Sequence, residues 1–334
     1  MSIDLPLIWA GLIAFAVLAY VVLDGFDLGI GILFPFLDSK ADRDLAMNSV
    51  APVWDGNETW LVLGGGGLMA VFPLAYATLL PALYAPIIAM LLGLIFRGVS
   101  FEFRGKTERG RWLWDFGFAG GSMVAALAQG ITLGALVQGI EVDNRAYAGG
   151  WWDWLTPFTL LTGLSVLVGY ALLGATWLFM KTENGLARQA RAAAWLTGGA
   201  LLVLMGAVTL SSAFLFPHYV ERWFSWPALL FTLFMPVLLL ACIAVFVRGL
   251  VRGHDSHPFL ATIGVFVLGF LGIAISFYPW MVPPHVTIEQ AAAPDSSLAF
   301  LLVGALILIP LILAYTGYAY WVFRGKVDPD EGYH

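Results

Sequence analysis

Long apolar runs separated by short polar connections recur along the whole chain. Each run is close to the length of about 20 residues that a helix needs to cross the hydrocarbon core of a bilayer. The first run is longer than a simple span, so we expect it to tilt or to extend beyond the bilayer. The second run is short and is divided from the third only around Pro73 to Tyr76. The pattern predicts nine membrane-spanning helices, at about residues 6–37, 53–72, 77–101, 114–138, 157–180, 194–216, 227–248, 259–280 and 298–323.

Composition supports this pattern over the full length of the chain. Apolar residues make up 60% of the 334 residues and charged residues only 11%, which excludes an ordinary soluble domain. We therefore expect residues 1–334 to form a single all-α integral membrane domain, with no nucleic acid among its partners. Cys242 is the only cysteine, so disulfides within the chain and cysteine-rich metal sites are excluded. The first residues carry no basic segment, and we expect no cleaved signal peptide.

The basic residues give the orientation. All but two of the 16 lysines and arginines fall in the connections after odd-numbered spans or in the adjoining helix ends. The two exceptions are Arg145 and Arg222. Because cytoplasmic loops carry the excess of lysine and arginine, the amino terminus is expected outside and the carboxyl terminus in the cytoplasm. Tryptophans near the predicted span ends fit the aromatic belts of a membrane protein.

Four acidic residues stand in the first two spans, where burial of charge is expensive and indicates function. Asp24 and Asp27 are spaced i, i+3 and project from one helix face. Asp24 is about 18 residues into a helix that starts outside, which places it roughly 27 Å deep, toward the cytoplasm. Asp55 and Glu58 repeat the spacing where the second span opens from the same side. The sequence therefore predicts an acid cluster that takes up protons from the cytoplasm.

A structural interpretation of the same acids stays open. They could cap helices or pair with Arg97 or Arg104, and Asp55 near a helix start would suit the helix dipole. Arg97 and Glu102 could join the cluster or anchor anionic lipid headgroups, although we expect Arg97 to reach the membrane surface by snorkelling. Asn57 adds an uncharged hydrogen-bonding group beside the acids.

Two further patterns bear on cofactors. Gly64, Gly65, Gly66 and Gly67 each cost about 1 kcal/mol of helix propensity, and we expect them to pack against a neighbouring helix rather than to line a cofactor site. No histidine lies within a predicted span, so a bis-histidine haem in the membrane is excluded and no metal site is expected. The histidines are His218 and His285 in outer loops, His254 and His257 in an inner loop, and His334 in the tail.

Several motifs occur in order along the chain. They are Leu23-Asp24-Gly25-Phe26-Asp27-Leu28-Gly29, then Met47 to Asn57 with Trp54-Asp55-Gly56-Asn57, then Phe96-Arg97 with Phe101-Glu102-Phe103-Arg104, Trp112-Leu113-Trp114-Asp115 and Phe277-Tyr278-Pro279. Taken together, over essentially the whole chain, they resemble the second subunit of cytochrome bd-type quinol oxidases. The Asp-Gly-Phe-Asp and Trp-Asp-Gly-Asn motifs on consecutive spans are highly specific for this resemblance.

The resemblance implies a haem-free, nine-span subunit of the bacterial cytoplasmic (inner) membrane, built from two four-helix bundles plus one extra helix. It implies a partner, subunit I, that carries haems b and d and the quinol site. The complex would oxidise quinol and reduce O2 to water with protons from the cytoplasm, and the family's proton-path aspartate falls on Asp55. A quinone held in this chain, a small single-span accessory subunit and bound membrane lipid belong to the same expectation.

One residue departs from the pattern, and two other functions compete with this one. Val53 stands where many relatives have histidine, which removes a titratable neighbour of Asp55 and, with the short outer loops, hints at the cyanide-insensitive branch. A self-sufficient proton-coupled transporter would also carry acids within its spans, but it should show paired broken helices in two related halves. A purely structural subunit would keep its acids paired and inert.

Overall fold

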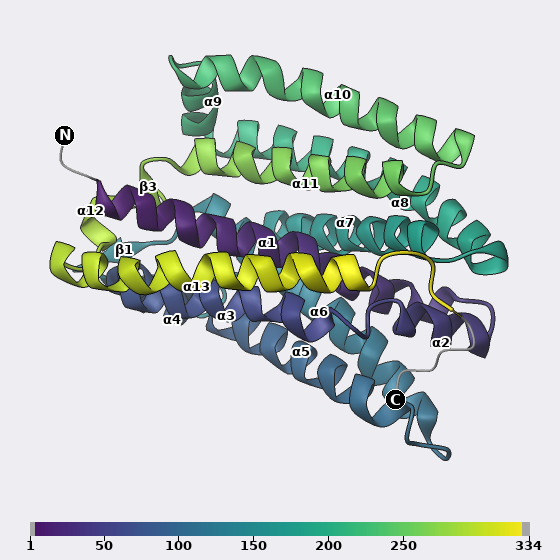
Figure 1. Ribbon diagram of the computed structural model, residues 1–334. Coiled ribbons are helices and arrows are strands. Elements are labelled where there is room, and N and C mark those ends of the chain that lie inside the picture. Colours follow the sequence, from purple (N-terminus) through teal and green to yellow (C-terminus); the bar gives the residue numbers. More distant parts are fainter. Residues whose placement is uncertain (1–3, 329–334) are drawn as a thin grey trace.

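The structure is a computed structural model that describes residues 4–328 and consists mainly of long helices lying side by side (Figure 1). His334 lies outside the described residues. Within that part of the chain nine helices of 18 residues or more run from one end of the molecule to the other. They are α1 (Leu5–Leu33), α3 (Trp54–Val71), α5 (Tyr84–Arg104), α6 (Arg111–Gln138), α7 (Pro157–Lys181), α8 (Asn184–Leu215), α10 (Ala228–Arg252), α11 (Ser256–Phe277) and α13 (Asp295–Val322). The expected all-α, multi-span fold is confirmed.

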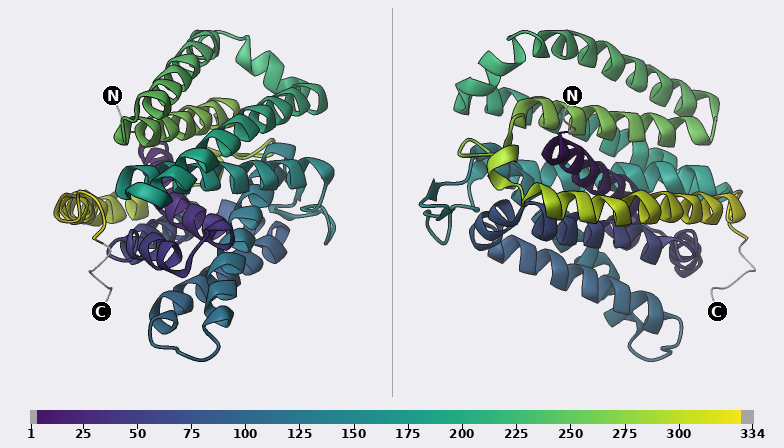
Figure 2. Two further views of the ribbon diagram at one scale, coloured as in Figure 1. Left: turned by 90° about the vertical axis from the view of Figure 1, so that its right-hand side faces the viewer. Right: turned by 60° about the vertical axis from the view of Figure 1, so that its left-hand side comes forward.

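Short elements cap the two ends of these helices. The end that holds the last turns of α1, α5, α7 and α13 also holds η1 (Phe34–Phe36) and α2 (Lys40–Asn48). At the opposite end lie the remaining short elements (Figures 1 and 2). These are α4 (Pro73–Ala82), β1 (Val142–Asp143), β2 (Ala146–Tyr147), α9 (Pro217–Trp223), β3 (Trp280–Val282), β4 (Val286–Thr287) and α12 (Ile288–Ala291). Strand β1 pairs with β2, and β3 pairs with β4; both pairs are antiparallel.

The long helices form two groups and one addition. Helices α1, α3, α5 and α6 pack into one four-helix bundle, and α7, α8, α10 and α11 form the second. The bundles meet where α7 lies against α1 and α6, while α13 lies along α1 and α3 at the outside of the molecule (Figure 2). The arrangement of two four-helix bundles plus one extra helix therefore agrees with the expectation.

Local signals in the sequence account for several helix starts. The side chain of Asp4 accepts a hydrogen bond from the Leu7 N–H at 3.0 Å and caps α1. Thr156 and Thr159 form a reciprocal capping box at the start of α7. Such caps satisfy N–H groups that have no partner within the helix, so they fix where a helix begins.

The predicted third span, 77–101, starts in the wrong place. Residues 77–82 belong to α4, which is bent by 119° from α3, and the spanning helix α5 starts only at Tyr84. Phe72 leaves the helical conformation with φ −123° and ψ 62°, and Pro73 opens α4. Proline has no N–H to donate and suits the first turn of a helix, so it favours a new helix start at Pro73, although Pro81, Pro236 and Pro310 stand inside helices of this protein. Eight helices are individually long and apolar enough to span, and the bent pair makes the ninth.

Glycines set the contact between the two bundles. A Cβ at Gly29 on α1 would collide with the carbonyl oxygen of Tyr170 and lie 2.7 Å from the Gly174 nitrogen on α7. The two helix backbones are therefore in direct contact at this crossing. The predicted packing role of the four glycines on α3 applies to two of them: Gly64 and Gly67 face α1, whereas Gly65 and Gly66 have open space beside them.

Substitution of Gly29 by Ala should destabilise the protein by about 1–3 kcal/mol, because overpacking forces two helix backbones apart. Gly11→Ala is the matched control, since Gly11 lies on the same helix and a Cβ there meets no atom within 4 Å. Thermal unfolding of both variants in the same detergent measures the difference. Equal stability of the two variants would contradict the backbone contact.

Candidate functional site: a buried arginine among three carboxylates

Arg97 is the centre of the charged site in the first bundle. Its side chain on α5 is completely buried, with 0% exposure. One terminal nitrogen lies 2.7 Å from Asp24 Oδ1 and 3.5 Å from Glu58 Oε2, and the other lies 3.6 Å from Asp27 Oδ2. The expectation that Arg97 snorkels to the membrane surface is wrong, because three carboxylates supply inside the protein the partners that water would otherwise provide.

Helix geometry brings these acids together. Asp24 and Asp27 are one turn apart on α1, and both are fully buried. Glu58 lies in the second turn of α3, which runs antiparallel to α1, and its side chain keeps 26% of its exposure. The predicted convergence of acids from two consecutive spans therefore holds for three of the four acids, around a cation from a third helix.

Aromatic rings close one side of the site. The Trp54 and Phe101 rings stack with centroids 4.8 Å apart, and the Arg97 guanidinium lies 5.7 Å and 5.9 Å from their centroids. An arginine near ring faces gains a cation–π attraction that is larger when the cation is desolvated. The rings also keep water from the guanidinium, so its charge must be balanced by the carboxylates.

Asn57 connects the acids to the last long helix. Its Nδ2 donates to Asp27 Oδ2 at 2.8 Å and to the Leu23 carbonyl at 3.2 Å. Its Oδ1 accepts a hydrogen bond at 2.8 Å from the hydroxyl of Tyr320 on α13. The supporting polar role expected of Asn57 therefore rests on these hydrogen bonds, whereas nothing in the sequence pattern pointed to Tyr320.

A second polar chain lies near the acids on the other side. Gln129 on α6 donates from Nε2 to the Tyr20 hydroxyl at 2.8 Å and accepts at Oε1 from the Tyr170 hydroxyl at 2.6 Å. Tyr20 lies one helical turn before Asp24 on α1 and is buried with it. Our sequence reasoning missed these residues, although an amide such as Gln129 in the middle of a predicted span is a usable signal.

Two of the predicted site residues lie outside the cluster. Asp55 is exposed on α3, one turn before Glu58 and on the solvent side of it. Glu102 is exposed on α5 and makes only an i, i+4 ion pair with Lys106 at 3.7 Å. Asp55 therefore lies on the exposed surface one turn from Glu58, and Glu102 takes no part in the buried site.

Arg104 and Arg111 build a separate ionic network nearer the end of the bundle. Arg104 contacts Asp115 at 2.5 Å and Asp44 at 2.6 Å, and Arg111 contacts Asp44 at 2.7 Å. The network joins α2, α5 and α6, and its acids are different from the four predicted ones. The alternative in which the predicted acids pair with Arg104 is therefore wrong, while pairing with Arg97 is what the structure has for three of them.

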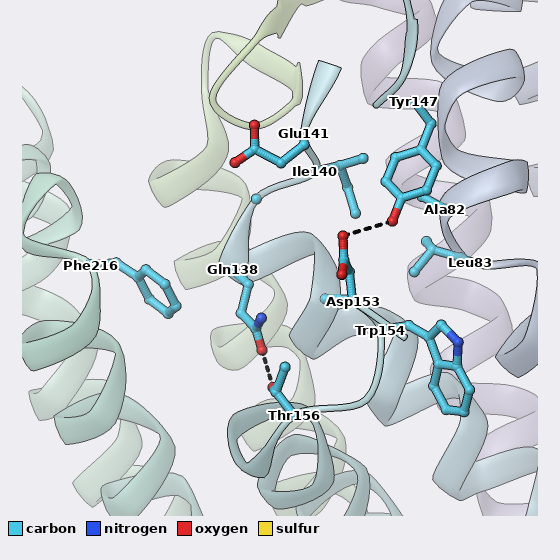
Figure 3. Close-up of a pocket in the computed structure, with 12 residues that line it drawn as sticks. Ala82, Leu83, Gln138, Ile140, Glu141, Tyr147, Asp153, Trp154, Thr156 and Phe216 are labelled. Carbon is cyan, nitrogen blue, oxygen red and sulfur yellow. Dashed lines mark hydrogen bonds between the residues drawn. The ribbon is translucent and has the colours of Figure 1, made fainter. Parts of the chain in front are cut away.

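A polar cavity of about 320 Å³ lies at the opposite end of the molecule (Figure 3). The Tyr147 hydroxyl donates to Asp153 at 3.0 Å within it, and Gln138 and Thr156 are hydrogen-bonded on another wall. Burial and the neighbouring Asp153 carboxylate raise the pKa of Tyr147 to about 12. Trp154 also lines this cavity.

Residues 4–328, which the structure describes, contain no group of three or more His, Cys, Asp or Glu side chains arranged to hold a metal ion. The His254 and His257 rings lie 4.8 Å apart, and both residues are exposed. His257 belongs to the first turn of α11 rather than to a loop. The chemistry of the buried site is therefore that of one guanidinium and several proton-binding carboxylates.

Comparisons with known proteins agree with one another over nearly the whole chain. A family model for cytochrome bd terminal oxidase subunit II matches residues 5–323. Subunit 2 of the cytochrome bd-I ubiquinol oxidase of Escherichia coli (strain K12) is 29% identical, over 98% of this chain and 96% of its own. The cytochrome bd ubiquinol oxidase subunit 2 of Bacillus subtilis (strain 168) is also 29% identical, over 97% of both. The structure of bd oxidase from Geobacillus thermodenitrificans shares the fold, with a TM-score of 0.76 at 18% identity over 96% of this chain and 99% of the matched one.

Arg97→Met should lower the stability by about 3–5 kcal/mol, because Asp24 and Asp27 would stay buried without a counter-charge. Lys106→Met is the control: it removes a basic residue from an exposed pair on the adjacent segment and should cost at most about 1 kcal/mol. Thermal unfolding and the yield of folded protein measure both. A small effect of Arg97→Met would show that the buried acids are held neutral without it.

Proposed function

The chain belongs to the family of cytochrome bd terminal oxidase subunits II, and we propose that within its quinol oxidase it provides the cytoplasmic entry for the protons that reduce dioxygen to water. The observation that carries this proposal is the acid cluster around Arg97, with exposed Asp55 one helical turn away from half-buried Glu58. Asp24 and Asp27 continue the same group of carboxylates into the bundle.

The charge balance supports a role in proton uptake. One guanidinium faces three carboxylates, so the cluster carries excess negative charge whenever all three are ionised. Acids that crowd together in a site of low dielectric do not all stay ionised, and such groups are suited to binding and passing protons. Asp55 would collect protons at the surface, and Glu58 is the next carboxylate inward.

The haems b and d are proposed to belong entirely to the partner, subunit I. The four histidines among the described residues, His218, His254, His257 and His285, are all exposed, at helix ends or in connections. A haem that needs histidine ligands inside the membrane would find none of these four in position. A quinone held in this chain and a small accessory subunit stay predictions.

The partner is proposed to cover the outer side of α3. Asp55, Thr59, Val62, Gly66 and Met69 are exposed there and follow helical spacing. An acid and a hydroxyl on a lipid-facing side of a spanning helix would be expensive, so a protein partner suits this face better than lipid. Asp55 lies in the first turn of α3 and would stand at the cytoplasmic rim of this interface, open to water and beside the haem-bearing chain.

The basic residues support an orientation in the bacterial inner membrane. The connections at the end of the molecule that holds α2 and the last turn of α13 carry nearly all the lysines and arginines of the chain. By the positive-inside rule this end would face the cytoplasm. The acid cluster opens toward the same end, as a proton entry from the cytoplasm requires.

Asp55→Asn should leave the complex assembled and its haem spectrum unchanged, while quinol oxidation slows by about tenfold or more, since proton relays contribute on that scale. Asp38→Asn is the control, because Asp38 is an exposed acid at the same end of the molecule. Oxygen consumption by the purified complex measures both. Unchanged turnover in Asp55→Asn would support a purely structural subunit.

Replacement of His218, His254, His257, His285 and His334 by Ala should leave the visible haem b and d bands of the complex unchanged. The physical reason is that none of the four described histidines lies in the interior of the helices. Absorption spectra of the purified complex, normalised to protein, test this. Loss of a haem band would place a ligand in this chain and contradict the proposal.

A further inference from the structure

The three carboxylates around Arg97 are not equivalent. Asp24 and Asp27 are completely buried, whereas Glu58 keeps 26% of its side-chain exposure. Asp27 also accepts a hydrogen bond from Asn57, and Glu58 has no hydrogen bond from another side chain within residues 4–328. The surroundings therefore distinguish Glu58, which is accessible for proton exchange, from Asp24 and Asp27, which are enclosed by the protein.

Asp27 is fixed through the amide of Asn57. Both N–H groups of Asn57 are engaged, one by Asp27 Oδ2 and one by the Leu23 carbonyl, and its oxygen accepts from Tyr320. Because the hydroxyl of Tyr320 occupies the amide oxygen, the NH2 group must face Asp27. An N–H donor facing a carboxylate stabilises its ionised form. If the amide turned over, its oxygen would face Asp27, and that contact needs a proton on the acid.

A second hydrogen-bonded chain lies beside Asp24 on the opposite side. Tyr170 donates to the Gln129 oxygen, so the Gln129 NH2 group is directed at the oxygen of Tyr20. The Gln129 NH2 group thus engages the Tyr20 oxygen one helical turn before Asp24 on α1. Asp24 itself is paired with Arg97 at 2.7 Å.

We infer that Glu58 is the carboxylate that exchanges protons with the cytoplasm, and that Tyr320 is a positioning residue which, through Asn57, keeps Asp27 ionised beside Arg97. This inference rests on the proposed proton-entry function. The charged groups that face Glu58 are Arg97 from α5, Asp24 and Asp27 from α1, and Asp55 from its own helix.

The proton balance follows from these charges. With Asp24 and Asp27 ionised, as the inference requires, and Arg97 a cation, the cluster apart from Glu58 carries one excess negative charge. That charge attracts a proton to the Glu58 carboxylate from the side of Asp55. A proton taken up from the cytoplasmic side neutralises Glu58, and its return to that side restores the carboxylate, so this exchange requires no change of protonation at Asp24 or Asp27.

Tyr320→Phe in the complete oxidase complex tests the positioning role. Loss of the hydroxyl frees the Asn57 oxygen, the amide can turn, and Asp27 can take a proton. The excess negative charge beside Glu58 then falls, so the pH at which turnover drops to half on the alkaline side should move down by about one unit. Tyr318→Phe is the matched control, because Tyr318 is an exposed tyrosine on the same helix and should leave the profile unchanged.

Glu58→Gln separates the inference from the function on which it rests. It should slow turnover and remove a pH-titrating carboxylic-acid band from the infrared difference spectrum of the complex. Slow turnover in Glu58→Gln together with an unshifted profile in Tyr320→Phe would overturn the positioning role and leave proton entry standing. A titrating band that survives in Glu58→Gln would overturn the assignment of Glu58. Unchanged turnover in both Asp55→Asn and Glu58→Gln would instead refute proton entry through this chain.

Discussion

One guanidinium that has no contact with water holds the first bundle in its arrangement. Arg97 comes from α5, and the carboxylates that balance it come from α1 and α3, so none of these helices can be displaced without exposing or orphaning a buried charge. Breaking such a buried pair costs several kcal/mol, far more than a surface ion pair contributes. The same requirement keeps charged side chains inside a bundle of apolar, membrane-length helices.

The neutral partners of this site extend its influence beyond the first bundle. Tyr320 ties α13 to α3 through Asn57, and Gln129 ties α6 to α7 through Tyr170. The last helix is therefore connected to the charged centre by hydrogen bonds, and the second bundle to Tyr20 on α1, one turn before Asp24.

Much of this fold could be predicted from the sequence, because hydropathy alone determines where a chain can cross a bilayer. The helix break at Pro73 was placed at the right residue, but the pattern could not show that 77–82 form a separate bent helix, since those residues are as apolar as the span that follows. Arg97 was misread because a span-end arginine normally snorkels, and only the fold brings three acids to it. The close contact at Gly29 and Gly174 was missed since isolated glycines carry no periodic signal.

Sequence spacing did predict the acids of α1 and α3 as a group, since i, i+3 positions share a helix face whatever the tertiary structure. Spacing could not show that Asp55 is exposed while the other three acids are buried or half-buried, because exposure depends on which side of α3 packs against α1. The alternative of a self-contained transporter gives way to membership of the oxidase family.

The crossing at Gly29 and Gly174 sets how closely the two bundles approach. The backbones of α1 and α7 are in direct contact there, two residues after Asp27, and no side chains separate the two bundles at this point. The charged centre therefore lies close to a helix contact at which neither position can carry a side chain, because a Cβ on Gly29 or on Gly174 would collide with the backbone of the other helix.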